Sequence, residues 1–413
     1  MMNPAKSSPA FKPAKILSRP AANEFQDLLK VACEATRMDL GRLIPSLISK
    51  CPRRLRPVRR YSEYNILNPW RAATLVRFLA DLTIPAAPES TPDLARMLMP
   101  PVVNRRFWRP TGFFRQPDEY AGVCSFPGEH WFFINGIATN EDVARYNSAL
   151  LAHLFHRPVT VVQNATCSLT VDLLECIIGK GLRPCDKKYM TEPAWRATAA
   201  ILEALNAEHI KRVIVIAHSQ GTIIMSNMLA VIGEALKSDF AMQEEPKWHD
   251  FTRELMGKVE TEAQKVLRNS LAHALAEFTT KKSAFVMDRL KKLEIYTFAN
   301  CADKMRYLHL TRPIPYMEHF ANEFDWVARL GILSPLRGGS RGTIEIDGPV
   351  FEQKGEWGHL LNEHYLTAID DYLYPGAEPF SREEDPFLPG SNGAEESRLY
   401  GYFHGKSPEA LWV

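Results

Sequence analysis

Residues 212–225 constrain the fold of this chain more than any other segment. A run of mostly β-branched residues (RVIVI, 212–216) leads into the pentapeptide AHSQG (217–221), and an apolar stretch follows (TIIM, 222–225). This order predicts a buried strand, a tight turn and a helix. Such a turn holds Ser219 in a strained conformation that brings residues 217 and 221 close together, where only small side chains fit easily.

Ser219 is therefore a candidate nucleophile. The start of the following helix would supply a partial positive charge and backbone N–H groups beside its hydroxyl. Ala217 departs from the G-x-S-x-G pattern of a nucleophile elbow, but alanine is a sterically mild replacement for glycine. The alternative is a serine in a helix cap without chemical function. We expect the neighbouring His218 to point away from the hydroxyl and to serve packing or support.

The chain from residue 131 onward alternates between apolar runs and amphipathic stretches. This alternation is typical of βαβ units and predicts an α/β fold, with a mostly parallel central sheet flanked by helices. The expected helices are 140–155, 192–208 and 220–236. The expected strands are 131–137, 159–164, 213–217, 293–298 and a last one around 316–324.

A hydrolase of esters or amides must stabilise a developing oxyanion with preset N–H donors. One donor would be the amide of Gln220, directly after the nucleophile. The other would lie in the loop that follows strand 131–137, where Gly136 lets the chain approach Ser219 and where Gly136 or Ile137 could donate. The alternative is a plain strand-to-helix turn.

The acid of a hydrolytic triad is expected between the serine and the histidine in this kind of fold. Tyr296-Thr297-Phe298, a later strand, and the step Asp325-x-Val327 resemble the corresponding stretch of lipase-type α/β hydrolases. In that family the aspartate of this step orients the catalytic histidine, so the resemblance implies Asp325 as the acid. Asp303, just after the preceding strand, and Glu323 remain alternatives.

The base is expected in a loop before the last helix. Gly358 supplies a turn there, and His359 would open a helix over 360–373. Contact between Asp325 and Nδ1–H of this histidine would leave Nε2 free to deprotonate Ser219. His364 lies five residues later and is the alternative base, and both histidines could instead be structural.

The resemblance covers roughly residues 130–373 and implies the α/β-hydrolase fold. The implied activity is that of a serine hydrolase that cleaves a carboxylic ester with an apolar or lipid-like acyl group through an acyl-serine intermediate. Acyltransferase or thioesterase activity on the same triad, and a non-catalytic binding protein with this fold, remain alternatives.

The domain organisation follows from these patterns. We expect a disordered basic N-terminus (1–22), a helical and irregular extension (23–125) with helices near 24–50 and 68–84, a catalytic domain (126–375) and a C-terminal tail (376–413). Residues 237–290 form a charged, helical insertion with apolar residues at helical spacing. This insertion is either a cap or lid that shapes an acyl pocket, or a helical hairpin packed on the domain.

Charge is unevenly distributed along the chain. Residues 1–60 hold thirteen Lys and Arg against four Asp and Glu, a balance of +9 in a chain whose net charge is +2. The densest part, 53–60, is either a solvated or domain-capping surface, or a site of peripheral contact with an anionic membrane. The net charge neither favours nor excludes a nucleic-acid partner, and we expect none.

The seven scattered cysteines lack CxxC pairs, which indicates reduced thiols in a cytoplasmic protein. The first 25 residues lack the apolar core of a secretory signal, although their composition leaves room for an organelle transit peptide. No 18-residue apolar run predicts a transmembrane helix. Since metal-ligand spacings and a phosphate-binding glycine loop are missing, we expect no metal and no cofactor.

Overall fold

The computed structural model describes the part of the chain that surrounds Ser219, together with shorter segments from both ends. The predicted N-terminus (1–22), the helices expected near 24–50 and 68–84, the basic segment 53–60 and Ile137 lie outside it. The described residues are 61–63, 65, 112–115, 128–136, 139–164, 192–237, 245–256, 262–279, 283–309, 312–334, 344–356, 358–366 and 397–411.

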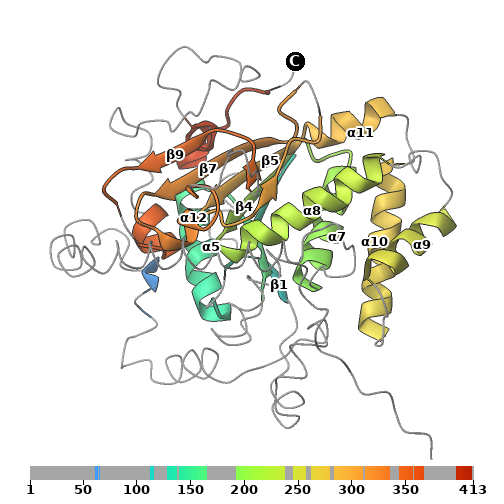
Figure 1. Ribbon diagram of the computed structural model, residues 1–413, viewed down its shortest axis with the longest axis horizontal. Helices are drawn as coiled ribbons and strands as arrows, with labels where there is room; N and C mark the ends of the chain where they lie inside the picture. Colours follow the sequence, from blue (N-terminus) through green and yellow to red (C-terminus); the bar gives the residue numbers. More distant parts are fainter. Residues whose placement is uncertain are drawn as a thin grey trace, which may run out of the picture.

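A seven-stranded sheet forms the centre of the structure, in the order β1-β3-β2-β4-β5-β7-β9 (Figure 1). Only β1 runs antiparallel, against β3, and all other neighbouring strands of this sheet pair in parallel. The prediction of an α/β fold with a mostly parallel sheet is therefore confirmed. The strands are β1 (Gly112–Arg115), β2 (Glu129–Ile134), β3 (Val159–Gln163), β4 (Arg212–His218), β5 (Leu293–Phe298), β7 (Tyr316–Asn322) and β9 (Val350–Gln353).

The five predicted strands correspond to β2, β3, β4, β5 and β7, and most residues of each strand are buried. The edge strands β1 and β9 were not predicted. Neither was the separate two-stranded parallel sheet of β6 (Lys304–Met305) and β8 (Glu345–Ile346). Strands of two to four residues show too little periodicity to be recognised in sequence.

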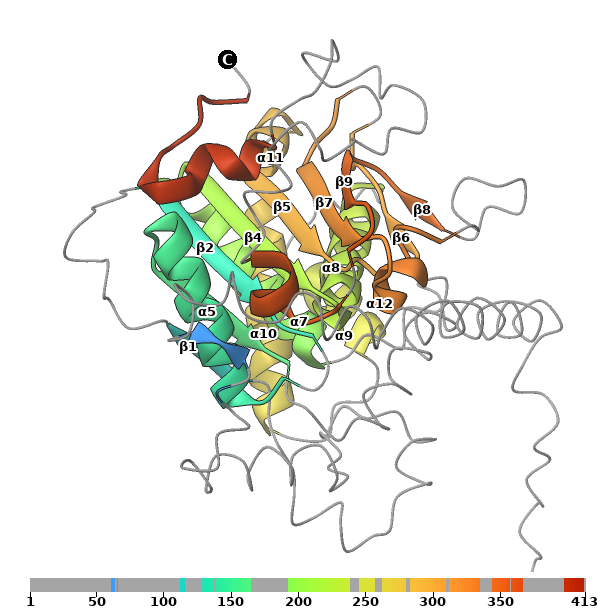
Figure 2. The same ribbon diagram turned by 90° about the vertical axis from the view of Figure 1, so that its left-hand side faces the viewer.

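Helices cover both faces of the central sheet, as predicted. Figure 2 shows α5 (Glu141–Phe155) on one face and α7 (Glu192–Asn206) with α8 (Gln220–Lys237) on the other. Side chains that alternate along each strand divide between two hydrophobic clusters, so that in β2 Phe133 packs on the α5 side and Phe132 on the α8 side. None of the described helices combines the length and apolar character that crossing a bilayer requires.

The insertion after α8 forms a second layer of helices. It comprises α9 (Glu245–Met256), α10 (Glu262–Thr279) and α11 (Ser283–Leu290). Trp248, Leu271 and Phe278 are buried in the same cluster as α7 and α8, and α10 lies along α7. The described helices of the insertion thus pack on the domain, and their apolar side chains join the cluster that contains α7 and α8.

Residues 397–411, within the predicted C-terminal tail, pack against the core. The 3-10 helix η9 (Arg398–Gly405) packs on the α5 face, where Leu399 and Tyr402 are buried. The ring of Tyr402 meets Trp131 of β2 edge-on, with centroids 5.1 Å apart. Residues 397–411 therefore differ from a tail, because apolar contacts with α5 and β2 hold them on the sheet.

Two buried carboxylates anchor this C-terminal segment. Glu318 of β7 accepts hydrogen bonds from the Ser397 hydroxyl (2.6 Å) and from the Arg398 main-chain N–H (2.7 Å), at the start of η9. Glu294 of β5 accepts two hydrogen bonds from the Arg398 guanidinium (2.9 and 3.0 Å) and one from Tyr402 (2.9 Å). Burial raises the pKa of Glu318, against the opposing effect of these hydrogen bonds.

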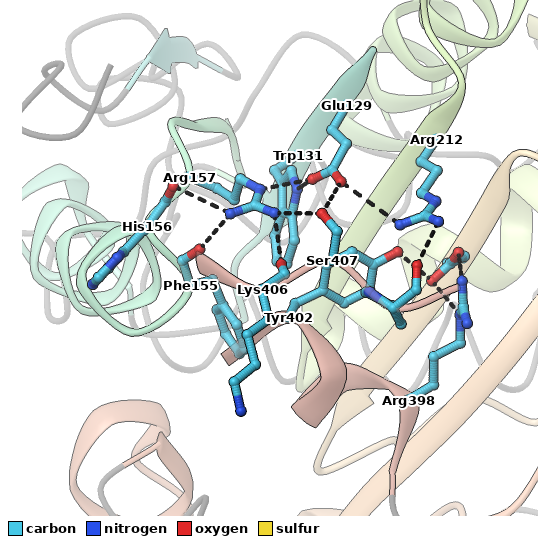
Figure 3. A network of polar contacts seen from close by, with 12 residues as sticks. Glu129, Trp131, Phe155, His156, Arg157, Arg212, Arg398, Tyr402, Lys406 and Ser407 are labelled. Carbon is cyan, nitrogen blue, oxygen red and sulfur yellow. Dashed lines mark hydrogen bonds and ion pairs between the residues drawn. The ribbon is translucent and has the colours of Figure 1, made fainter. Parts of the chain in front are cut away.

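A third carboxylate, Glu129 at the start of β2, completes the network (Figure 3). It pairs with buried Arg157 at 2.7 Å and with Arg212 at 3.7 Å, and it accepts a hydrogen bond from Ser407. Arg157 also donates to the main-chain carbonyl of Lys406 (2.8 Å). The charged ends of β2, β4, β5 and β7 are thus covered by the C-terminal segment.

Removal of Arg398 should strongly destabilise the protein. Arg398→Leu leaves Glu294 buried without its cation, which should cost about 3–5 kcal/mol of unfolding free energy. The matched control is Arg306→Leu, because Arg306 pairs with Glu345 at the surface and should contribute less than about 1 kcal/mol. Urea unfolding of both variants measures the difference, and equal losses would show that the buried pair has no special weight.

Candidate active site

Ser219 lies in the predicted tight turn between β4 and α8. Its φ of +56° is in the left-handed region, which costs a non-glycine residue on the order of 1–3 kcal/mol. Thr222 fixes the turn, because its main-chain N–H and its hydroxyl both donate to the Ser219 carbonyl (2.9 and 2.7 Å). The Ser219 N–H donates to Phe298 of β5 (3.0 Å). Local hydrogen bonds thus maintain the strained serine.

Two glycines allow the backbone to pack closely around this turn. A Cβ atom on Gly221 would lie 2.3 Å from the carbonyl oxygen of Ile134, so the first turn of α8 can reach the end of β2 only with glycine. A Cβ atom on Gly136 would lie 2.5 Å from Cβ of Ser219 and 3.0 Å from its Oγ. The loop after β2, in which the second oxyanion donor was expected, therefore lies directly against Ser219, and its role as a donor stays a prediction.

Buried amide side chains connect the two segments predicted to form the oxyanion hole. Asn135 donates to the carbonyls of Gly136 and Asn164 (3.0 Å each), and its side-chain oxygen accepts from the Asn164 N–H (2.7 Å). Asn164 in turn donates from its side chain to the side-chain oxygen of Gln220 (2.5 Å). The loop after β2 and the first residue of α8 are thus both tied to Asn164, directly after β3.

Ser219, His359 and Asp325 form a continuous chain of hydrogen bonds. Nε2 of His359 lies 3.0 Å from Oγ of Ser219. On the other side of the ring, Nδ1 lies 2.9 Å from Oδ2 and 3.2 Å from Oδ1 of Asp325. Since a carboxylate only accepts, Nδ1 carries the proton and Nε2 is left to accept from the serine hydroxyl. A nucleophile, a base and an orienting acid would require this arrangement.

Asp325 is buried at the start of α12 (Trp326–Arg329), where it accepts the main-chain N–H of Val327 (2.9 Å). Tyr365 donates its hydroxyl to Oδ2 at 2.6 Å. Burial alone would raise the pKa of Asp325, but the nearby His359 and the hydrogen bonds from His359, Tyr365 and Val327 outweigh it and lower the pKa. The carboxylate is therefore ionised at neutral pH, as the orientation of a base requires.

The alternative acids lie in other contacts. Asp303 directly precedes β6, and its main-chain carbonyl accepts the N–H of Glu345 (2.7 Å). Glu323 closes the turn after β9 by accepting the N–H of Gly355 (2.7 Å). The structure thus places Asp325 with His359, and it places Asp303 and Glu323 in backbone contacts of neighbouring loops.

The alternative base, His364, packs against the turn that carries His359. Its Nδ1 accepts the main-chain N–H of Leu360 (3.0 Å), and its ring fills the space beside Gly358, whose φ is +99°. Burial lowers the pKa of His364 to about 4. A π-helical turn (Leu361–Tyr365) stands where the sequence predicted the start of a helix over 360–373, and residues 367–373 lie outside the described ranges. His364 therefore helps to shape the turn.

Sequence reasoning missed Tyr365, since nothing local indicates that its hydroxyl reaches Asp325. It also missed the contact of the N-terminal segment with the turn that carries His359. Glu63 accepts the N–H of Asn362 (2.9 Å) and the side-chain amide of Asn147 (2.7 Å). Burial raises the pKa of Glu63 to about 7. A segment 300 residues away in sequence thus holds the turn in place.

Within the described ranges, no three His, Cys, Asp or Glu side chains gather closely enough to bind a metal ion. No family model matches the chain, and no curated protein matches it. Among solved structures, a hyperthermophilic esterase from the archaeon Pyrobaculum calidifontis is similar at 12% identity, with a TM-score of 0.27, over 57% of this chain and 71% of that chain. Similarity at this level supports no conclusion about activity, so the site is interpreted from its own geometry.

Acidification should destabilise the protein through His218, the residue before Ser219. Burial and the neighbouring His359 lower the pKa of His218 from 6.5 to about 3. The unfolded chain therefore takes up this proton first, and stability falls as the pH drops from about 6.5 towards 3. At pH 5 the loss from this one group should be about 2 kcal/mol.

Urea unfolding at pH 7 and pH 5 measures this loss, with His218→Gln as the comparison, since glutamine does not titrate. The variant should lose less stability than the wild type between the two pH values. Equal losses in both proteins would contradict the assignment of a neutral, buried His218.

Proposed function

We propose that this protein is a serine hydrolase that cleaves carboxylic esters through an acyl-Ser219 intermediate. The observation that carries the proposal is the hydrogen-bonded chain from Oγ of Ser219 to Nε2 of His359, and from Nδ1 of His359 to Asp325. A merely structural serine would not need a strained backbone conformation beside a histidine that is oriented by a buried carboxylate.

In the first half-reaction, His359 Nε2 takes the hydroxyl proton of Ser219 while Oγ forms a bond to the ester carbonyl carbon. The carbonyl electron pair moves to oxygen and gives a tetrahedral oxyanion. When this intermediate collapses, the bond to the leaving alcohol breaks and the imidazolium returns its proton to that oxygen. Asp325 stabilises the imidazolium between the two steps. Water then attacks the acyl-enzyme by the same route and releases the acid.

The oxyanion would be held by main-chain N–H groups at the start of α8 and in the loop after β2. Gln220 and either Gly136 or Ile137 are the proposed donors. Support comes from the approach of Gly136 to Ser219 and from the amide network through Asn135 and Asn164, which fixes both segments before a substrate arrives. Such preorganisation is what makes an oxyanion hole effective.

An apolar ester is the substrate class that the surroundings favour. Trp326 directly follows the acid, and 38% of its surface is exposed although it is large and apolar. Its ring centroid lies 6.3 Å from that of His359. Because His359 protonates the leaving alcohol, Trp326 would offer an apolar surface to that part of the ester. Attack of an acceptor alcohol on the same acyl-enzyme would instead give acyl transfer.

The proposal predicts a covalent adduct on Ser219. A fluorophosphonate probe should add one phosphonyl group to the wild-type protein, detected by intact mass, and none to Ser219→Ala. Product analysis with a p-nitrophenyl ester, with and without added alcohol, would separate hydrolysis from acyl transfer. A wild-type protein that gives no adduct, or an adduct that survives in Ser219→Ala, would refute the proposal.

The two histidines provide the internal control. His359→Ala should lower kcat on the order of 10²-fold or more, because general base catalysis is lost. His364→Ala should lower stability and retain most of kcat at a temperature where the variant is folded. Near-normal kcat in the His359 variant would assign the base elsewhere.

Trp326 should determine affinity for apolar esters. Trp326→Ala should raise KM for an ester of an apolar alcohol about tenfold and should change KM for the methyl ester of the same acid little, since loss of an apolar contact costs a few kcal/mol at most. Val266→Ala on α10 is the control, because Val266 is also exposed and apolar but lies on the insertion. An equal change of KM for both esters would remove Trp326 from the substrate site.

A further inference from the structure

His218 contacts the proposed base directly. It is the last residue of β4 and is buried, with 6% of its surface exposed. Its ring stacks on the ring of His359, with centroids 4.8 Å apart and an angle of 30° between the planes. The ring of Tyr365, which donates to Asp325, meets it edge-on at 6.3 Å. One imidazole thus packs against both the base and the residue that holds the acid.

His218 also contacts the main chain of the base. Its Nε2 lies 2.9 Å from the carbonyl oxygen of His359. A carbonyl only accepts, so Nε2 must carry the proton and donate. Burial first, and the charge that His359 can carry second, lower the pKa of His218 to about 3. The ring is therefore neutral at pH 7, and it makes this hydrogen bond without placing a second positive charge beside the base.

We propose that His218 is a positioning residue for the base of the proposed reaction. Its Nε2–H fixes the main chain of His359, and its ring face fixes the plane of the imidazole, so that Nε2 of His359 stays within reach of Oγ of Ser219. This inference rests on the proposed function. It assigns the residue before the nucleophile a role in the reaction that exceeds packing.

The covalent link between His218 and Ser219 explains why this arrangement is effective. The nucleophile and the support of the base belong to consecutive residues of one turn, whose backbone is held by Thr222 and Phe298. Any movement of the turn therefore shifts both groups together and preserves the 3.0 Å contact between Oγ and Nε2. A misplacement of about 1 Å at a reacting group costs on the order of 10²-fold in rate.

A buried histidine elsewhere in the sheet provides a matched comparison. His319 of β7 is also buried, and its Nε2 lies 2.7 Å from the main-chain carbonyl of Asp347. It thus makes the same kind of hydrogen bond, but to the loop before β9, while its Nδ1 faces Thr297 and Asn300. Substitution of either histidine by phenylalanine removes an N–H donor from a main-chain carbonyl, and of the two only His218 contacts the proposed base.

Steady-state kinetics of three full-length variants tests the inference. His218→Phe keeps an aromatic ring and loses the donor, so kcat should fall about 10–100-fold with KM within twofold of the wild type. His218→Gln places an amide N–H near the position of Nε2 and should recover at least half of that loss on a logarithmic scale. His319→Phe should lower the midpoint of thermal unfolding and leave kcat unchanged while the protein is folded.

The outcomes separate this inference from the proposed function. If the wild type gives no phosphonyl adduct, the proposed function fails. If the wild type reacts and His218→Phe keeps wild-type kcat, or loses no more than His319→Phe, the positioning role is refuted. Should His218→Phe not fold, ¹⁵N NMR of the His218 ring in the labelled wild-type protein decides instead. The ring must then stay neutral and protonated at Nε2 from pH 5 to 9, and titration in that range would refute the inference.

Discussion

The close approach of α8 to the end of β2 is the constraint on which the rest of the site depends. A Cβ atom at residue 221 would lie 2.3 Å from a carbonyl oxygen of β2, so this crossing exists only because Gly221 has no side chain. Ser219 is the single residue between β4 and α8, so the tight turn that this crossing requires lies at Ser219, whose φ is +56°. Gly136 then allows the loop after β2 to reach the same serine. Packing of the sheet against α8 therefore places the hydroxyl.

Buried carboxylates lie at both ends of the parallel strands, but their hydrogen-bond partners differ. At their carboxyl ends, Asp325 is the buried charge, and a histidine and a tyrosine compensate it while leaving one ring nitrogen to act on Ser219. At their amino ends, Glu294 and Glu318 are fully engaged by Arg398, Ser397 and neighbouring tyrosines. Buried charges cost several kcal/mol each unless they are paired. The C-terminal segment pairs the charges at one end, whereas at the other end the proposed function uses the paired carboxylate.

The sequence predicted those parts of the structure that short-range patterns determine. β2, β3, β4, β5 and β7 lie inside the sheet, and most of their five to seven residues are apolar and buried. The turn at Ser219 is local too, because the small residues that it requires lie within five adjacent positions (217–221). The lipase-like step Asp325-x-Val327 pointed to Asp325, and the turn at Gly358 pointed to His359. The structure brings the side chains of these two residues to within 2.9 Å of each other. Their catalytic roles stay predictions.

Contacts between distant segments could not be predicted in this way. η9 has an ordinary amphipathic composition, and its place in the core depends on Glu318 and Glu294, about 80 and 104 residues earlier in the chain. Tyr365 and Glu63 are likewise unremarkable in sequence, since their importance comes from reaching Asp325 and the main chain of Asn362.

The position of His359 shows why such distant contacts matter most where geometry has to be accurate. The turn Leu361–Tyr365 is short and π-helical, and a loop of this length would not by itself hold a side chain to within a fraction of an ångström. Support comes from three directions: the N-terminal segment through Glu63, β4 through His218 and α12 through Asp325. Each of these contacts restrains a different atom group of the turn, namely the amide of Asn362, the carbonyl of His359 and its Nδ1. Because the three supports come from separate parts of the chain, the proposed base is correctly placed only when all of them have folded. The proposed activity would therefore depend on complete folding rather than on any one segment.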